Sequence, residues 1–262
     1  MIIVLSVVIF LAFVALWVLP PFLKQGKTGG VSLKWHLFSL LAGAIVACGV
    51  AVVIQLFVVD KIVEASGITG VALHLVNAFI SASLIEEAFK FACGRVVLHF
   101  SKAVRKIDYI FIIGAAGVGF ELTETFLGMN GDTNIVGGII RGVTCLHVFL
   151  QLFMGVHLYE YHKAKKAGNN GRTVGEFILT FLVPFFVHGF NDFSLFMLQE
   201  GMSGSAEALA AGNYSELSLS GGTMVGIVMV ILGIAIDIVF MIFTLKAVYK
   251  ESKNSRLADV NF

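Results

Sequence analysis

The sequence predicts an all-α integral membrane protein, a polytopic bundle of about seven transmembrane helices, each near the bilayer-spanning length of roughly 20 residues. The hydrophobic fraction is 58% and the charged fraction only 13%, whereas a soluble domain averages about a quarter charged residues. Mean hydropathy is +0.92. Helices are expected because they satisfy their own backbone hydrogen bonds in lipid.

Each element is predicted from a run with little or no charge, because charge is costly inside lipid. The runs lie at 2–22, 36–59, 69–94, 108–128, 135–159, 176–199 and 222–246. They are too long and too uniformly apolar for barrel strands, which are alternating segments of about ten residues. We expect one transmembrane domain over 1–262, with a catalytic core at 69–199 and peripheral helices at 2–22, 36–59 and 222–246.

The basic residues of the predicted loops fall almost entirely on one side of the membrane. That side carries Lys24, Lys27, Lys34, Lys102, Arg105, Lys106, Lys163, Lys165, Lys166, Arg172, Lys246, Lys250, Lys253 and Arg256. The opposite side carries only Lys61. Since basic loops stay in the cytoplasm, we expect the N-terminus outside and the C-terminus in the cytoplasm of a multi-pass protein. A net charge of +1 argues against nucleic acid as a partner.

Charged residues inside the spans concentrate in the third to sixth spans, although each costs about 2.5–3.5 kcal/mol at the bilayer centre on insertion scales. In the third span, Lys90 follows Glu86 by four residues and Glu87 by three, so it can reach either one. Adjacent helical side chains point about 100° apart. We therefore expect one glutamate to pair with Lys90 and the other to face a cavity; a purely structural ion pair is the alternative.

The fourth span carries Phe120, Glu121 and Glu124. Phe120 and Glu124 share a helix face at i, i+4, and the two glutamates share one at i, i+3. No lysine or arginine lies within a turn of them. They therefore need water, a metal ion, a histidine or a proton as a partner. The alternative is that both glutamates are hydrated at the outer interface.

Histidines occupy the next two spans. His188 and Asp192 face the same way at i, i+4, with Asn191 close to that face. A carboxylate one turn away orients an imidazole and makes it more basic, and the same spacing suits two ligands of one metal ion. His147 in the fifth span is, taken alone, more typical of a packing residue.

Together these side chains supply the groups needed to hydrolyse an amide with an activated water. A carboxylate in a desolvated cavity suits a general base near neutral pH, and histidine and asparagine can donate to a developing oxyanion. The sequence has no H-E-x-x-H motif that would require a metal. A metal-free site is therefore favoured, and zinc remains the alternative. The ligands expected for zinc are Glu86, Glu124, His147 and His188.

These residues also resemble the motifs of a known family. In chain order they are Glu86-Glu87-x-x-Lys90, Phe120-x-x-x-Glu124, His147 and His188-x-x-x-Asp192. Their order and spacing over about 86–193 resemble the PrsW family of intramembrane proteases, which is related to the Abi and CAAX-processing endopeptidases. PrsW proteins commonly have Asn after the glutamate of the fourth span, where this chain has Thr125, so we assign no role to that position.

The resemblance implies a glutamate-dependent protease embedded in the membrane. Glu86 or Glu87 would activate water, and Glu124, His147 and His188 would be essential. Asn191 and Asp192 complete the catalytic set by assisting the histidines, and supporting positions are expected for Lys90, Phe120 and Glu121. The implied substrate is a single-span membrane protein, such as a membrane-bound anti-sigma factor, in the bacterial cytoplasmic membrane.

Two alternatives from other functional classes remain open. Intramembrane carboxylates and histidines also form the relays of ion- or proton-coupled transporters. The sequence has no detectable internal repeat of the kind that marks many transporters. A non-catalytic membrane scaffold is the other alternative, and it would tolerate loss of the polar residues.

Overall fold

The computed structural model describes residues 30–127, 145–210 and 221–258, together with residues 8 and 11. Regular structure in these ranges is helical throughout and includes no strand, which confirms the all-α prediction. The predicted span 2–22 lies almost wholly outside the described residues. The same is true of 135–144, the start of the fifth predicted span.

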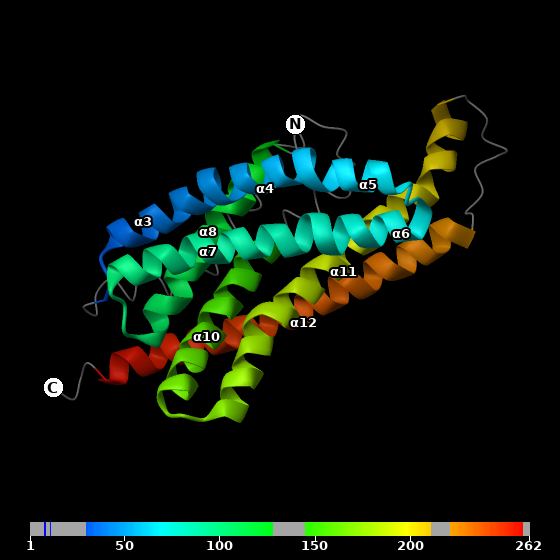
Figure 1. Ribbon diagram of the computed structural model, residues 1–262. Helices are drawn as coiled ribbons and strands as arrows, with labels where there is room; N and C mark the ends of the chain where they lie inside the picture. The colour runs from blue at the N-terminus through cyan, green and yellow to red at the C-terminus, as the bar shows by residue number, and fades with distance from the viewer. Residues whose placement is uncertain (1–7, 9–10, 12–29, 128–144, 211–220, 259–262) are drawn as a thin grey trace.

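Two long helical rods open the described chain and run side by side (Figure 1). The first consists of α3 (Leu33–Leu41), η2 (Ala42–Ala47), α4 (Cys48–Ile54), η3 (Gln55–Val59) and α5 (Asp60–Ser66). The second consists of α6 (Gly70–Leu75), η4 (Val76–Leu84) and α7 (Ile85–Ser101). The η segments are π-helical, a wide form that is frequent at functional sites. Gly67 separates the rods because its φ of 66° is left-handed, a conformation that favours glycine and ends a helix.

Four further helices follow in the described part of the chain. They are α8 (Lys106–Leu127), α10 (Leu146–Lys166), α11 (Asn170–Ala210) and α12 (Gly221–Ala258). The sixth span was expected to end at 199, but α11 continues to Ala210. No proline follows within that stretch, and its alanines, leucine and glutamate are good helix formers, so nothing local ends the helix.

Four of the described helices are long and apolar enough to cross a membrane: Leu33–Ser66, Gly70–Ser101, Asn170–Gly201 and Met224–Asn254. They coincide with four of the predicted spans. The helices α8 and α10 lie where two more spans were predicted, but they carry more of the polar residues and are mostly buried by their neighbours. The total of seven spans and the direction of the termini stay predictions.

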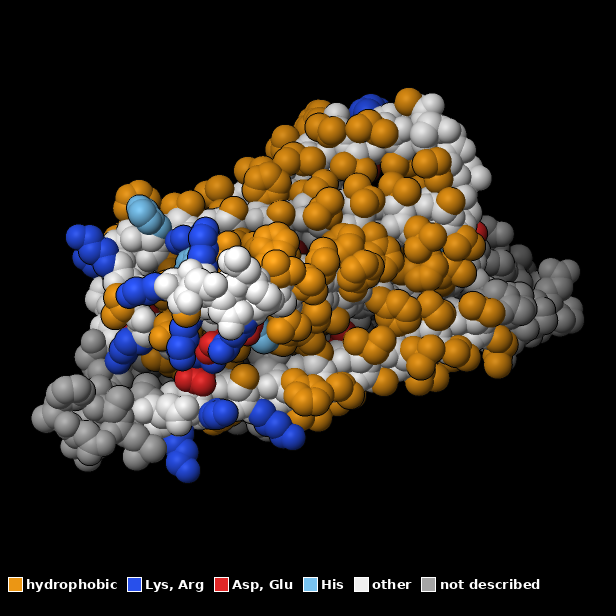
Figure 2. All heavy atoms as spheres, turned by 60° about the horizontal axis from the view of Figure 1, so that its bottom comes forward, with side chains coloured by type: hydrophobic (Ala, Val, Ile, Leu, Met, Phe, Trp, Pro, Cys, Tyr) orange, Lys and Arg blue, Asp and Glu red, His pale blue; other side chains and the backbone are white. Residues whose placement is uncertain are grey.

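The outer surface of the bundle is apolar. Large hydrophobic side chains such as Ile45 and Phe57 are 68% and 70% exposed. Figure 2 shows hydrophobic side chains over most of one face, with lysine and arginine side chains gathered mainly at one end. So large an apolar surface would be unstable in water but matches a lipid surrounding, as the sequence predicted for a membrane protein.

The interior is built around α8 and α10. Their side chains Ile110, Ile113 and Leu150 have no exposed surface. The first rod approaches α8 so closely that two of its contacts leave no room for a side chain. A Cβ at Gly119 would lie 1.9 Å from the carbonyl oxygen of Leu40, and one at Gly43 would lie 2.0 Å from that of Ala116. Small residues permit such close helix contacts in membranes.

We therefore expect Gly119→Ala to lower the free energy of unfolding by about 1–3 kcal/mol, because the added methyl group forces the α3 and α8 backbones apart. Gly49→Ala is the matched control, since a Cβ there has nothing within 4 Å. The measurement is equilibrium unfolding in mixed micelles. Equal stabilities for the two variants would contradict the close contact.

Candidate functional site

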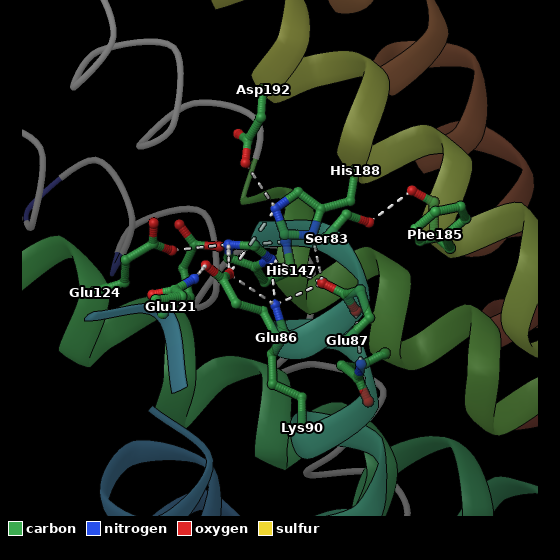
Figure 3. Close-up of polar contacts among 12 residues, drawn as sticks. Ser83, Glu86, Glu87, Lys90, Glu121, Glu124, His147, Phe185, His188 and Asp192 are labelled. Atoms are coloured by element: carbon green, nitrogen blue, oxygen red, sulfur yellow. Dashed lines mark hydrogen bonds and ion pairs between the residues drawn. The ribbon is translucent and has the colours of Figure 1, made fainter. Parts of the chain in front are cut away.

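Polar side chains from four helices meet in the interior of the bundle (Figure 3). They are Glu86, Glu87 and Lys90 of α7, Glu121 and Glu124 of α8, His147 of α10, and His188 and Asp192 of α11. All of them except Glu124 are buried. The residues that the sequence singled out in separate spans therefore lie together in space.

Glu87 is at the centre of this cluster. Its Oε1 lies 2.9 Å from Nδ1 of His188 and 3.2 Å from Nδ1 of His147. The same oxygen lies 2.5 Å from the ammonium nitrogen of Lys90. Its Oε2 accepts a hydrogen bond of 2.8 Å from Nε2 of Gln151. Since both oxygens of Glu87 are engaged, this carboxylate acts as an acceptor that holds other side chains and is poorly placed to accept a proton from water.

Lys90 places an ammonium group beside Glu87. Its side chain has no exposed surface, and its Nζ lies 2.6 Å from Nδ1 of His147. The ammonium also lies 4.2 Å from the centre of the Phe120 ring, a cation–π contact. Lys90 lies within ion-pair distance of both glutamates, at 2.5 Å from Glu87 and 3.7 Å from Glu86, so its closer partner is Glu87.

Glu86 has a free oxygen. Its Oε1 accepts a hydrogen bond of 3.1 Å from Nε2 of Gln55. Its buried Oε2 has no hydrogen-bond partner among the described residues. That oxygen lies 3.8 Å from Nε2 of His147 and 3.9 Å from Nε2 of His188. Oε2 of Glu86 therefore has three nitrogen atoms within ion-pair distance, those of Lys90, His147 and His188, but a hydrogen bond to none of them.

The two imidazoles have matching surroundings. Their rings stack edge-on with centroids 4.6 Å apart. Each has Glu87 at Nδ1 and a second carboxylate at Nε2: Glu124 at 2.8 Å from His147, and Asp192 at 3.2 Å from His188. The i, i+4 relation between His188 and Asp192 therefore produces the predicted contact, and the missing partner of Glu124 is a histidine of another helix.

The other predicted residues lie either in the cluster or next to it. Glu121 is only 3% exposed, so the hydrated alternative is wrong for it; its Oε2 accepts a hydrogen bond of 3.3 Å from the backbone N–H of His147. Phe120 packs edge-on against the His147 ring. Asn191 is buried, but its amide donates to Asp237 of α12 and not to the carboxylates of the cluster.

Sequence reasoning did not assign Gln55, Gln151 or Asp237 to the site. The two glutamines each hold one carboxylate of the Glu86–Glu87 pair. An uncharged amide in an apolar span is a weak signal, because such groups commonly form ordinary interhelical hydrogen bonds. Their partners lie 31 and 64 residues away in the chain, so no local spacing indicates them.

Glu86, His147 and His188 together fit a metal ion. One ligand atom from each lies within 4.8 Å of the others, and two imidazoles with one carboxylate form a known donor set of catalytic zinc. Glu87 would orient both rings through Nδ1, as outer carboxylates do at many metal sites. The charges also favour a cation, because five carboxylates face one ammonium and two imidazoles among the described residues. The five are Glu86, Glu87, Glu121, Glu124 and Asp192.

Comparison with known proteins yields one match. A family model described as PrsW family intramembrane metalloprotease matches residues 31–236, which include every polar residue of the cluster. No curated protein and no solved structure matches the chain.

The buried charge of Lys90 predicts a large effect on stability. We expect Lys90→Met to lower the free energy of unfolding by about 3–5 kcal/mol, because it leaves Glu87 buried without its counter-charge. Adding Glu87→Gln to Lys90→Met should recover part of that loss. Both variants can be compared with the wild type by denaturation in mixed micelles.

Lys61→Met is the matched control for this prediction. Lys61 forms an ion pair of 2.8 Å with Glu64, but the two side chains are 68% and 72% exposed. Its removal should cost no more than about 1 kcal/mol. Equal losses for Lys61→Met and Lys90→Met would show that Lys90 does not compensate a buried charge.

Proposed function

Because the chain belongs to the PrsW family of intramembrane proteases, we propose that it hydrolyses a peptide bond in or near the transmembrane region of a single-span membrane protein. The observation that carries this proposal is the free Oε2 of buried Glu86, which faces Nε2 of both His147 and His188. The transporter and scaffold alternatives have no comparable support, since the family is one of proteases.

We further propose that the site binds a divalent metal, with zinc as the ion best suited to the donors. Glu86, His147 and His188 would hold it. The sequence alone favoured a metal-free site; the donor set, the excess of carboxylates and the family's description as metalloproteases support the metal alternative instead. When bound, such an ion makes a water molecule more acidic and polarises the scissile carbonyl group.

The other polar side chains of the cluster have separate roles in this proposal. Glu87 holds the two imidazoles by their Nδ1 atoms, and Lys90 compensates the charge of Glu87. Glu124 is the general base in this proposal, because its side chain is 22% exposed against 10% for Glu86 and 4% for Glu87. A carboxylate that water can reach is able to accept its proton and pass it to the leaving amine.

Without a metal, the same geometry supports a second version of the mechanism. The free Oε2 of Glu86 would itself accept the proton of the attacking water. Protonated His147 or His188 would then stabilise the oxyanion. Glu87 is the base in neither version, because both of its oxygens are engaged.

The wider setting belongs to the same proposal. The chain would form one domain of seven spans in the bacterial cytoplasmic membrane, with its N-terminus outside. The one-sided distribution of lysine and arginine supports this orientation. A membrane-bound anti-sigma factor is the substrate class that the family resemblance suggests, and the lipid-facing apolar surface is consistent with a substrate that arrives through the bilayer.

We expect Glu86→Gln, Glu124→Gln, His147→Ala and His188→Ala each to lower the cleavage rate by about 100-fold to 10,000-fold, because each removes a proton carrier or a ligand. The assay is cleavage of single-span substrates, including membrane-bound anti-sigma factors, after reconstitution together in liposomes. Glu64→Gln and His157→Ala are the matched controls, since Glu64 is exposed and His157 pairs with Glu176 outside the cluster. If all four site variants cut at the wild-type rate, the proposed function is wrong.

The metal can be tested separately. We expect the purified wild type to hold about one divalent ion per chain and to lose cleavage when a chelator removes it, with recovery on adding Zn²⁺. Glu86→Gln and His188→Ala should retain less metal than His157→Ala by elemental analysis. Full activity in metal-depleted protein would instead support the version in which Glu86 activates water alone.

A further inference from the structure

Asp237 is a buried carboxylate that the mechanism above does not use. It lies in α12 and is 4% exposed. One oxygen, Oδ2, accepts a hydrogen bond from the side-chain amide of Asn191 in α11. The other, Oδ1, is buried and has no hydrogen-bond partner among the described residues. The family match covers residues 31–236 and ends one residue before Asp237.

The contact with Asn191 belongs to a close antiparallel seam between α11 and α12, which run side by side in Figure 1. A Cβ at Gly226 would lie 2.6 Å from Cα of Leu198, so the two backbones nearly touch there. A Cβ at Gly233 would lie 3.0 Å from the hydroxyl of Ser194. About one turn beyond Gly233 and Ser194, Asp237 lies opposite Asn191. The two glycines therefore set the register that brings this carboxylate to Asn191.

Asn191 connects this seam to the cluster. It lies three residues after His188 and directly before Asp192, the residue that contacts Nε2 of His188. Its backbone carbonyl accepts a hydrogen bond of 2.6 Å from the hydroxyl of Ser194. Both its backbone and its side chain are thus held by groups of the seam. An amide group has two N–H bonds, and Asp237 engages the amide nitrogen from the side of α12.

We propose that Asp237 is a positioning residue of the active site and acts through Asn191. It anchors the Asn191 side chain to α12, and with it the turn of α11 that carries His188 and Asp192, so that His188 keeps its position against Glu86 and Glu87. A seam of glycines would hold the two helices together without a carboxylate, and burying an ionisable group in a membrane helix is costly. The positioning role would explain why a carboxylate is buried here despite this cost. It rests on the proposed protease activity.

The test compares kcat and KM for Asp237→Ala, Asp237→Asn, Asn191→Ala and the double variant Asn191→Ala/Asp237→Ala in the liposome cleavage assay. Asp237→Ala should lower kcat by about 10-fold to 100-fold with little change in KM, because displacement of His188 is felt in the reaction step. Asp237→Asn should keep most of the activity, since its side-chain oxygen can still accept from Asn191. The double variant should be no slower than Asn191→Ala.

Thr244→Val is the matched control. Thr244 lies two turns further along α12, is fully buried, and its hydroxyl also has no hydrogen-bond partner among the described residues. It should cleave at the wild-type rate. Gel filtration and thermal unfolding identify variants that do not fold. If Asp237→Ala does not fold, the test rests on Asp237→Asn and on the comparison of Asn191→Ala with the double variant Asn191→Ala/Asp237→Ala.

Three results would overturn the positioning role. They are wild-type kcat in Asp237→Ala, an equal loss in Asp237→Asn and Asp237→Ala, and additive losses in the double variant. In each case an active wild type with an inactive Glu86→Gln shows that the proposed protease function still holds. If Glu86→Gln also cleaves like the wild type, the protease function itself has failed and the role of Asp237 fails with it.

Discussion

The structure depends on one constraint: charges buried inside an apolar bundle have to be compensated by one another, because neither lipid nor bulk water can do it. The pair of Lys90 and Glu87 meets this constraint at the centre of the molecule. The fully buried ammonium allows a carboxylate to remain between two imidazoles, with Nδ1 of each ring within ion-pair distance of it. Everything reactive in the site, including the free oxygen of Glu86, is arranged around this pair.

The arrangement of the helices follows from the same constraint. The rods α3–α5 and α6–α7 expose long apolar faces, whereas α8 and α10 carry polar groups and are mostly buried between their neighbours. Close contacts at Gly43 and Gly119 allow the first rod to pack tightly on α8. The polar interior and the apolar exterior are therefore two results of one packing arrangement, in which the ionisable side chains of α7, α8, α10 and α11 face one another and the apolar side chains face outward.

Several parts of the site could be predicted because they are local. The pairing of His188 with Asp192, and of Lys90 with a glutamate one turn earlier, follows from helical spacing alone. The choice between Glu86 and Glu87 does not, because both lie within reach of Lys90 along the helix. It depends on Gln151 and the two histidines, which approach Glu87 from other helices. Gln55 and Asp237 were not assigned for the same reason, since their partners are distant in the chain.

Composition and helical spacing were enough to predict a helical membrane protein, the approximate places of its spans and the ionisable side chains that need partners inside them. These properties depend on composition and on periodicity within one helix, both of which can be read from neighbouring residues. Only the tertiary structure decided which groups meet: Glu86 with the outer nitrogens of His147 and His188, Glu124 with His147, and Asn191 with Asp237. The physical reason is that such contacts depend on the register and rotation of one helix against another, and these are fixed by close packing between segments far apart in the chain.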